Sequence, residues 1–365
     1  DADDNPLTEW CTALNVPLAY LPSTRARISE EHVGDGPARY RDYATALQRA
    51  RRGMAAAGIA IGSAAARHEL AAWRSSTAQP SLAQALTPII EHRGALPSYD
   101  RQMLGYVISM AEGVEGAPFE RIALESWFPR EVEAVNAMPV GGYRRLTDDA
   151  AVGLDIRLET PVTTIQHDDQ GVCLSTPRGQ FSGDAVIVTV PLSMLQQDRL
   201  RFDPPLPAAW REAVARIGFG RGAALNKIYL RFDHQFWPRT NDRMISLPVD
   251  LDERGRFVTW MSLADLLDAP VLLSFSSGAN GAILDTEASD GEIVAIALDS
   301  LRRIFGAAVP EPVDYRLTRW LCEPWTAGSY SFNDVTTQRA DRLRYAQPIH
   351  DRLYFAGEAA SPRYY

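Results

Sequence analysis

The run Ala185–Val190, "AVIVTV", is continuously apolar and rich in β-branched residues, and it limits the possible folds more than any other stretch. Such a run is typical of a buried strand in a parallel sheet, and Pro191 ends it because proline cannot donate to a sheet ladder. A buried strand needs covering layers, and segments with helix and strand patterns do alternate along the chain. We therefore expect an α/β (or mixed α+β) protein in two interwoven parts.

Residues 29–130 have the periodicity of helices, with apolar residues at three- and four-residue spacing in segments such as "PARYRDYATALQRARRGMAAAG". Several helices are expected there. Gly58 and Gly62 stand among small residues, as in a phosphate-binding loop, but the G-x-G-x-x-G spacing is absent and no strand precedes them. These glycines favour helix termination or close helix packing instead.

The pattern changes to strands after Gly141–Gly142. Residues 155–169 and 171–179 are expected to pair as a hairpin or meander, with turn residues at 168–171. Further strands are expected in "NKIYLRF", "RFVTWMSL" and "APVLLSFSSG". Two helices are expected among them, in the proline-started "PPLPAAWREAVARIGFG" and in "DGEIVAIALDSLRRIF".

Composition excludes several classes of function. The 365 residues suffice for two domains or one large one, and 46% hydrophobic with 23% charged residues is ordinary for a globular protein. The net charge of −9 argues against nucleic acid as a partner and favours a cationic small molecule. The three cysteines and six histidines form neither a disulfide pattern nor a metal-ligand spacing, so no metal is expected. No run of eighteen apolar residues and no signal-peptide pattern are present, which predicts no membrane association and favours the cytoplasm.

The segment "LNKIYLRFDHQFWP", residues 225–238, places a lysine inside a predicted strand. Period-two alternation puts Lys227 on one face with Tyr229 and Arg231, and it puts Ile228 and Leu230 on the other. From this window alone, Lys227 is most simply a solvated lysine on a polar face.

Four segments in order resemble one family: "GGYRRL…LDIRLETPVTTI", "AVIVTVPLSML…RFDPPLP", "IGFGRGAALNKIYLRFDHQFW" and "RWLCEPWTAGSYSF…RLYFAGEAAS". The family is that of the flavin-dependent amine oxidases, which include polyamine oxidases, monoamine oxidases and the flavin-type histone lysine demethylases. The resemblance implies FAD as the cofactor. It also implies the fold of that family, in which a Rossmann-like FAD-binding part is interleaved with a substrate domain of mixed sheet and helices.

The resemblance divides the chain into two domains. It predicts an FAD-binding domain at residues 1–28, 141–205 and 340–365. The substrate-binding domain is predicted at residues 29–140 and 206–339.

The same resemblance implies catalytic residues. Lys227 corresponds to a strand lysine that holds a water close to N5 of the flavin, where an ammonium group can assist the reoxidation of reduced flavin by oxygen. Tyr330, in "GSYS", is the second catalytic candidate. Trp320 and Trp325 fall where the family places aromatic side chains around the flavin ring and the substrate channel, although tryptophans are also common in cores.

Five further residues are implied as cofactor-binding. Gly357 and Glu358, in "FAGEAAS", match a flavin-binding motif in which glycine permits close approach to a phosphate and the carboxylate accepts hydrogen bonds. Val162 matches a position whose backbone meets the adenine. Thr189 and Pro191 match a turn beside the cofactor.

The resemblance has a gap at each end of the family pattern. The G-x-G-x-x-G turn that binds the pyrophosphate, and the acidic residue that follows it, are absent, as is the last segment that covers the flavin. Three interpretations follow: a longer polypeptide carries these segments, a second chain supplies them, or the product is a flavin-free relic. The implied partners are therefore an amine and oxygen, together with a homodimer partner or a second chain that completes the FAD site.

The function implied by the resemblance is an FAD-dependent oxidase. It removes hydride from the carbon α to an amine and gives an imine and hydrogen peroxide, with a polyamine or another primary or secondary amine as substrate. One alternative is an L-amino-acid oxidase, which needs an arginine for the substrate carboxylate, with Arg93 and Arg101 as candidates. Another alternative is a flavin-free, non-catalytic binding protein. A histone demethylase is conceivable, but no basic tail or added interaction module favours it.

Overall fold

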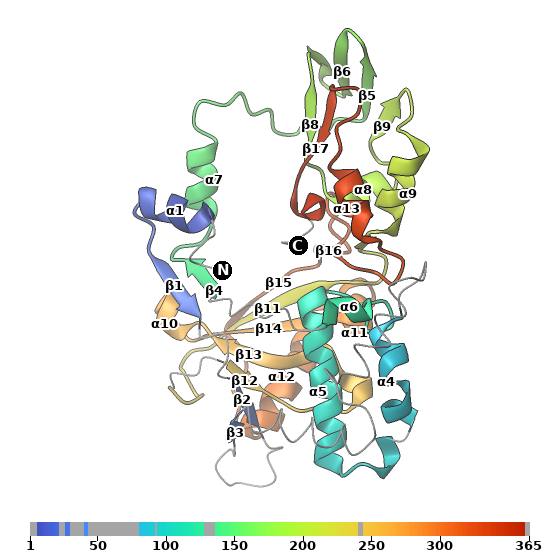
Figure 1. The fold of residues 1–365 in the computed structure, drawn as a ribbon. Coiled ribbons are helices and arrows are strands. Elements are labelled where there is room, and N and C mark those ends of the chain that lie inside the picture. The colour runs from blue at the N-terminus through green and yellow to red at the C-terminus, as the bar shows by residue number, and fades with distance from the viewer. Residues whose placement is uncertain are drawn as a thin grey trace.

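The computed structural model describes residues 6–21, 26–29, 40–42, 80–91, 93–127, 136–239 and 244–361. Figure 1 shows a large sheet with its helices in the lower half of the view, and a set of smaller sheets and helices above it at the right. A third, small part lies at the upper left. Helices and strands are mixed throughout, in agreement with the predicted fold class.

A seven-stranded sheet organises the lower region. Every neighbouring pair of its strands is antiparallel except β12 with β2. In spatial order the strands are β15 (Asp314–Leu317), β11 (Leu225–Arg231), β14 (Val271–Ser277), β13 (Arg256–Ser262), β12 (Met244–Ser246), β2 (Ala26–Ser29) and β3 (Tyr40–Asp42).

Helices pack on this sheet and close the main core. The long helix α5 (Ser98–Glu115) contacts β13 and β14, while α11 (Gly278–Glu287) contacts β11 and β14, and α12 (Asp290–Phe305) contacts β13. Three shorter helices complete the region: α4 (Leu82–Glu91), α6 (Leu124–Trp127) and α10 (Ala264–Leu267).

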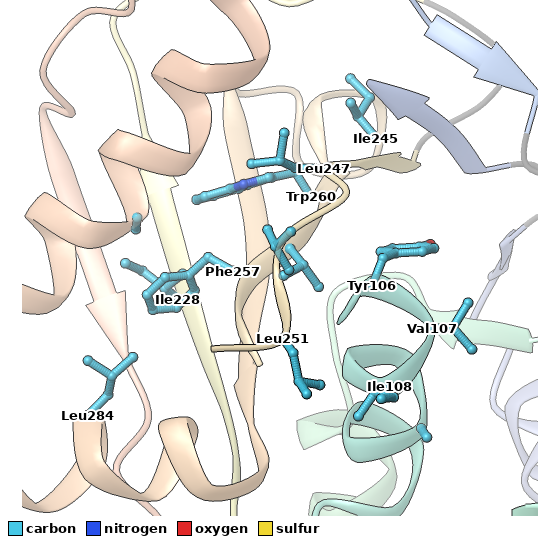
Figure 2. Close-up of a cluster of buried hydrophobic side chains, with 14 of the residues drawn as sticks. Tyr106, Val107, Ile108, Ile228, Ile245, Leu247, Leu251, Phe257, Trp260 and Leu284 are labelled. Carbon is cyan, nitrogen blue, oxygen red and sulfur yellow. The ribbon is translucent and has the colours of Figure 1, made fainter. Parts of the chain in front are cut away.

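Large apolar side chains fill the main core, as Figure 2 shows. Trp260 of β13 is fully buried, and its indole N–H donates to Ser300 Oγ at 3.1 Å. Tyr106 of α5 is also buried, and its hydroxyl donates to Ser246 Oγ at 3.1 Å. Because the polar atoms of these two residues are satisfied inside the core, their large apolar surfaces can contribute fully to stability.

The upper right region contains two separate sheets. One is four-stranded, in the order β7-β6-β5-β9, and the other is the parallel pair β8–β17. The elements are β5 (Thr164–Asp168), β6 (Gly171–Thr176), β7 (Gly179–Gly183), β8 (Val186–Val188), α8 (Leu192–Gln196), β9 (Arg201–Asp203), α9 (Ala208–Arg216), α13 (Arg339–Tyr345) and β17 (Leu353–Phe355).

A second core joins these elements. The Trp210 ring lies 4.4 Å from that of Phe355 and 5.7 Å from that of Tyr345, measured between centroids. Trp210 belongs to α9, which lies in the stretch predicted for the substrate-binding domain but packs here with β17 and α13. The short antiparallel pair β10 (Gly218–Phe219) and β16 (Ser331–Phe332) follows.

The small part at the upper left of Figure 1 is built on the antiparallel pair β1 (Leu18–Leu21) and β4 (Asn136–Pro139). Helices α1 (Pro6–Ala13) and α7 (Arg144–Ala150) accompany it, and the Trp10 indole N–H donates to Asp149 Oδ2 at 2.9 Å. Cys11, Val16 and Leu146 form its apolar centre.

Several local predictions are confirmed. The hairpin β5–β6 turns where expected, and Asp168 Oδ1 accepts hydrogen bonds from the amides of Gln170 at 2.7 Å and Gly171 at 3.1 Å. Helix α12 has the predicted bounds, and Ser289 and Glu292 form a capping box at its start. The predicted parallel strand is β8, which pairs with β17.

Other local predictions were wrong. Tyr40–Asp42 is a strand rather than part of a helix, because it pairs with β2 at the sheet edge. The hairpin strand begins at Thr164 rather than 155, since Pro161 cannot donate to a ladder. Ile187 of β8 is 66% exposed, so this apolar run is not buried on both faces. The glycine pair 58 and 62 lies outside the described residues. Within the described residues, no helix combines the length and apolar character needed to span a membrane.

Candidate active site

Lys227 lies on β11 with its side chain on the face opposite the main core. Burial alternates along the strand, so that Asn226, Ile228 and Leu230 are buried while Lys227 and Tyr229 are partly exposed. This observation confirms the predicted alternation of faces.

The surface around Lys227 is apolar. Its direct cross-strand partner on β14 is Phe275, and the next pair on the same face is Tyr229 with Leu273. Within the described residues, no carboxylate forms an ion pair with the Lys227 ammonium. A half-buried cation without a partner costs desolvation energy, so Lys227 is a candidate functional residue rather than a stabilising one. The apolar cluster that continues this surface contains Met138, Met244, Met261, Leu263 and Val271.

Lys227 is also the one lysine of the sequence, because the other 36 of the 37 basic residues are arginines. The lysine ammonium group is a compact charge with three rotatable N–H donors, whereas the arginine guanidinium group is planar and holds its N–H donors in a fixed geometry. Lys227 therefore differs chemically from the other basic side chains of the sequence, because its small ammonium group can donate to a single water molecule.

Tyr330, the second predicted catalytic residue, is held at the C-terminal end of α5. Its hydroxyl lies 3.0 Å from the carbonyl oxygens of both Gly113 and Val114 and can donate to either. Burial, followed by the charges of Glu115 and Glu358, raises the pKa of Tyr330 well above its ordinary value. The hydroxyl is therefore a permanent donor to the helix end, and the ring is the part that can face a ligand.

Trp320 and Trp325 lie in the loop between β15 and β16. Their exposed fractions are 37% and 62%, which rules out the core-packing interpretation for Trp325. Trp320 borders a cleft of about 500 Å³ at the open edge of β15. The other residues that line this cleft are Asp290, Tyr315, Arg316, Leu317, Thr318, Arg319 and Glu323.

Four of the predicted cofactor-binding residues meet at one edge of the upper region. Strands β8 and β17 are parallel and in register, and the Ala356 amide donates to the Val188 carbonyl at 3.1 Å. Thr189 and Gly357 therefore follow the carboxyl ends of adjacent parallel strands, where nucleotide ligands bind in open α/β sheets. Pro191, two positions after Thr189, is the N-cap residue of α8.

Glu358 is held by two contacts with Ser331. The Ser331 amide donates to one carboxylate oxygen at 3.0 Å, and the Ser331 hydroxyl donates to the other at 2.7 Å. The buried Arg342 donates in turn to Ser331 Oγ at 2.7 Å. Each carboxylate oxygen has two acceptor sites, so Glu358 retains capacity for ligand hydroxyl groups.

These residues fit the ribityl and phosphate part of FAD. Gly357 has φ 127°, and a Cβ atom built there would meet nothing within 4 Å, so the backbone is open to a ligand. Glu358 offers acceptors next to it, and Thr189 offers a hydroxyl. Val162 lies before β5 and packs against the second core, away from any described contact with the other four. The 365 residues contain no G-x-G-x-x-G turn for the pyrophosphate.

The arginines named for an amino-acid carboxylate are engaged elsewhere. Arg101 forms an ion pair with Asp250 at 2.7 Å, and Arg93 donates to the Ile90 carbonyl at 2.8 Å. Neither belongs to the surface around Lys227. In the described part of the chain, no group of three histidine, cysteine or acidic side chains could hold a metal ion.

Sequence reasoning missed the residues that support the predicted ones. Ser331 and Arg342 hold Glu358, and a buried polar network of Asn226, Asp285 and Thr318 underlies Lys227. A signal existed for Asn226, because it is a polar residue on the apolar face of an alternating strand. The long-range partners had no signal, since Asp285 is 59 positions away in the sequence.

Comparison with known proteins gives a consistent result. A family model described as flavin containing amine oxidoreductase matches residues 6–365. Lysine-specific histone demethylase 1 homolog 1 of Oryza sativa subsp. japonica is 33% identical over 279 residues, which are 75% of this chain and 32% of that protein. Polyamine oxidase 4 of the same organism is 32% identical over 284 residues, which are 77% of this chain and 56% of that protein.

The chain thus spans about a third and about half of the lengths of these two relatives. Among solved structures, putrescine oxidase bound to putrescine aligns with a TM-score of 0.69 and 18% identity, over 98% of this chain and 80% of that one. At that identity the similarity establishes the fold.

Proposed function

The chain belongs to the flavin containing amine oxidoreductase family, and from this premise we propose that it acts as an FAD-dependent amine oxidase on a polyamine or another primary or secondary amine. The products would be an imine, which water hydrolyses to an aldehyde or ketone, and hydrogen peroxide. The proposal is supported by the polyamine oxidase relative and by the isolated Lys227 on its apolar surface.

FAD supplies the hydride acceptor when bound, and it is the cofactor of this family. The protein holds it with Gly357, Glu358 and Thr189 at the carboxyl ends of β8 and β17. Ser331 orients the Glu358 carboxylate by two hydrogen bonds, and Arg342 holds the Ser331 hydroxyl in turn, so the remaining acceptor sites of Glu358 are available to ligand hydroxyl groups.

Lys227 is the observation that carries the proposal. Its ammonium group has no ion-pair partner in the described part of the chain, and it can donate to a water molecule. The apolar surface of Tyr229 and Phe275 beside it keeps other water away, so the water bound to Lys227 has a defined place. The amine substrate must lose its proton before hydride leaves, and the low polarity of this surface favours the neutral amine.

Lysine demethylation is the second candidate, favoured by the demethylase relative from rice. Both activities use the same chemistry on a C–N bond and differ in what surrounds the amine. The L-amino-acid oxidase alternative loses support, because Arg93 and Arg101 are occupied by other partners.

The visible absorption spectrum of the full-length gene product tests the proposal. We expect a flavin band that bleaches under argon with spermidine, putrescine or a methylated lysine peptide, but not with L-amino acids, and that returns with air as peroxide forms. Lys227→Met is expected to bleach but to recover more slowly than wild type, while Arg231→Met on the same strand serves as the control. A protein that takes up no FAD would contradict the proposal.

A further inference from the structure

The hydrogen-bond ladder between β11 and β15 ends beside Lys227, and a side chain continues it. Ile228 and Leu317 are the last residues paired in this ladder. One position beyond, the Lys227 amide donates to Thr318 Oγ1 at 2.8 Å, and the Thr318 amide donates to the Lys227 carbonyl at 3.0 Å. Thr318 therefore forms hydrogen bonds with both the backbone N–H and the backbone C=O of Lys227.

Asn226 fixes the Thr318 hydroxyl from the opposite face of the strand. Its side chain is 5% exposed and has a partner for each end. The amide oxygen accepts from Thr318 Oγ1 at 3.2 Å and from the Trp320 backbone amide at 3.0 Å. Lys227 and Trp320 are thus connected through two side chains, Thr318 and Asn226.

Asp285 of α11 anchors this connection. Its Oδ2 atom accepts from Asn226 Nδ2 at 2.8 Å and from the Leu321 amide at 2.8 Å. The residue is 2% exposed, and its Oδ1 atom has no hydrogen-bond partner among the described residues. A buried carboxylate with an unpaired oxygen is costly for folding alone. The presence of the Asp285 carboxylate here is explained if the hydrogen-bond network positions the residues of the site around Lys227.

We propose that Asn226 and Asp285, acting through Thr318, are positioning residues that fix the Lys227 ammonium relative to the Trp320 loop; this rests on the proposed function, in which Lys227 and Trp320 border the flavin. The network ties the backbone of Lys227 to that of Trp320 and Leu321 over five hydrogen bonds. Catalytic groups displaced by about 1 Å can lose 10²-fold in rate. A rigid link between the two flanks of the site prevents such a displacement.

Three features separate this role from ordinary core packing. The network lies where the β11–β15 ladder ends, so on this side of β11 Thr318 rather than a paired strand residue fixes the Lys227 backbone. Four of the five bonds involve Lys227 itself or the loop that carries Trp320, and the fifth, from Asn226 to Asp285, anchors Asn226. Asn226 is a polar residue on the buried face of β11, where its neighbours Ile228 and Leu230 are apolar.

Thr318→Val and Thr318→Ser provide a matched test. Valine has the shape of threonine but no hydroxyl, whereas serine retains the hydroxyl and loses the methyl group. Selective ¹³C-lysine labelling of the full-length FAD-containing protein gives an ε-methylene signal for Lys227, which is assigned by its loss in Lys227→Arg. In wild type we expect one narrow signal displaced from that of free lysine.

In Thr318→Val the signal is expected to move towards free lysine or to broaden, and kcat is expected to fall about tenfold or more with little change in KM. Thr318→Ser should restore both. Asn226→Ala should reproduce the valine result. The proposal is overturned if Thr318→Val gives the wild-type signal and kcat, whether or not its thermal stability falls.

The lysine signal does not depend on turnover. If the protein binds no FAD or oxidises no amine, the signal can still report the network, so failure of the proposed function and failure of this inference are distinguished.

Discussion

The seven-stranded sheet and the parallel pair β8–β17 differ in how completely they are covered. In the first, five strands have neighbours on both sides, and the side chains below them form one closed core. In the second, each strand has one neighbour among the described strands, and Ile187 and Tyr354 are 66% and 37% exposed. The predicted catalytic Lys227 lies on the well-covered sheet, while the predicted cofactor residues Thr189 and Gly357 follow the sparsely covered one.

This difference suggests separate roles for the two sheets: the seven-stranded sheet supplies a rigid support, and the β8–β17 pair supplies a ligand-binding edge. If Lys227 is catalytic as predicted, it must stay within about 1 Å of a fixed place, which a rigid sheet with its hydrogen-bond network provides. A parallel pair alone buries too little surface to be stable, so β8 and β17 depend on α9 and α13, and also on FAD if it binds there as predicted. Stability should therefore be concentrated in the lower region, and ligand dependence in the upper one.

The largest effect is expected from truncation in the main core. Trp260→Ala removes a fully buried indole and its hydrogen bond to Ser300, which should lower the free energy of unfolding by about 3–5 kcal/mol. Ile187→Ala on the exposed face of β8 should change it by less than about 0.5 kcal/mol. Urea denaturation of both variants measures the comparison, and equal losses would show that the two regions do not differ.

The next effect depends on pH and concerns Glu112 of α5. This side chain is fully buried beside Arg254, and Gly278 approaches so closely that a Cβ atom there would lie 2.4 Å from the Glu112 carboxyl carbon. Burial raises the pKa of Glu112 from 4.5 to about 7, against the lowering effect of Arg254, and Glu120 adds to the rise.

The sign of the pH dependence follows from proton binding. Between pH 4.5 and 7 the folded protein retains the Glu112 proton that the unfolded chain has lost, so this stabilisation is complete below pH 4.5 and disappears as pH rises to 7. At about 1.4 kcal/mol for each pH unit, the loss amounts to about 3 kcal/mol. Glu112→Gln should flatten the stability curve in this window, whereas Glu120→Gln, which removes only the smallest contribution to the raised pKa, should change it little. An unchanged slope in Glu112→Gln would contradict the assignment.

Sequence patterns predicted those parts of the fold that local chemistry determines. The alternation in β11, the helix α12 and the β5–β6 turn all depend on residues within a few positions of each other. The strand Tyr40–Asp42 was missed because its pairing with β2, rather than its own sequence, makes it a strand. The same holds for the site. Lys227 could be named from its sequence motif, whereas the role of Asp285 could not be predicted, because it depends on the packing of α11 against β11.

A smaller effect is expected for the ion pair that joins α9 to α13. Arg216 holds the buried Asp341 with two nitrogens, at 3.0 Å and 2.6 Å, and Asp341 also caps α13 through the Gln338 amide. Asp341→Asn keeps the shape and removes the charge, and we expect a loss of about 2 kcal/mol because the partly buried Arg216 loses its partner. Addition of FAD should recover part of this loss if the upper region depends on its ligand.

The matched control for this pair is Asp155→Asn, which disrupts the exposed ion pair of Arg157 and Asp155 at 2.8 Å. Exposed pairs contribute little, so its thermal stability should match that of wild type. If Asp341→Asn is as stable as Asp155→Asn, the contact between α9 and α13 does not hold the upper region together.

The smallest effect on stability, and the clearest on ligand binding, is expected at Trp325. Its side chain is 62% exposed, so Trp325→Ala should change the free energy of unfolding by less than about 0.5 kcal/mol. If the ring covers bound flavin as predicted, the same substitution should weaken FAD binding about tenfold, a typical effect for a lost aromatic contact. Titration of the apoprotein with FAD, followed by quenching of flavin fluorescence, measures this directly.

Tyr20→Ala removes an aromatic ring of similar exposure, 55%, from strand β1, which none of the predicted site residues belongs to. Its FAD affinity should equal that of wild type. If both variants lose FAD affinity, exposed aromatic rings affect FAD binding through the general stability of the protein. The proposed separation between a rigid catalytic sheet and a ligand-dependent cofactor region would then be wrong. Loss in Trp325→Ala alone would place the flavin between the two regions, with the loop from β15 to β16 contributing to both.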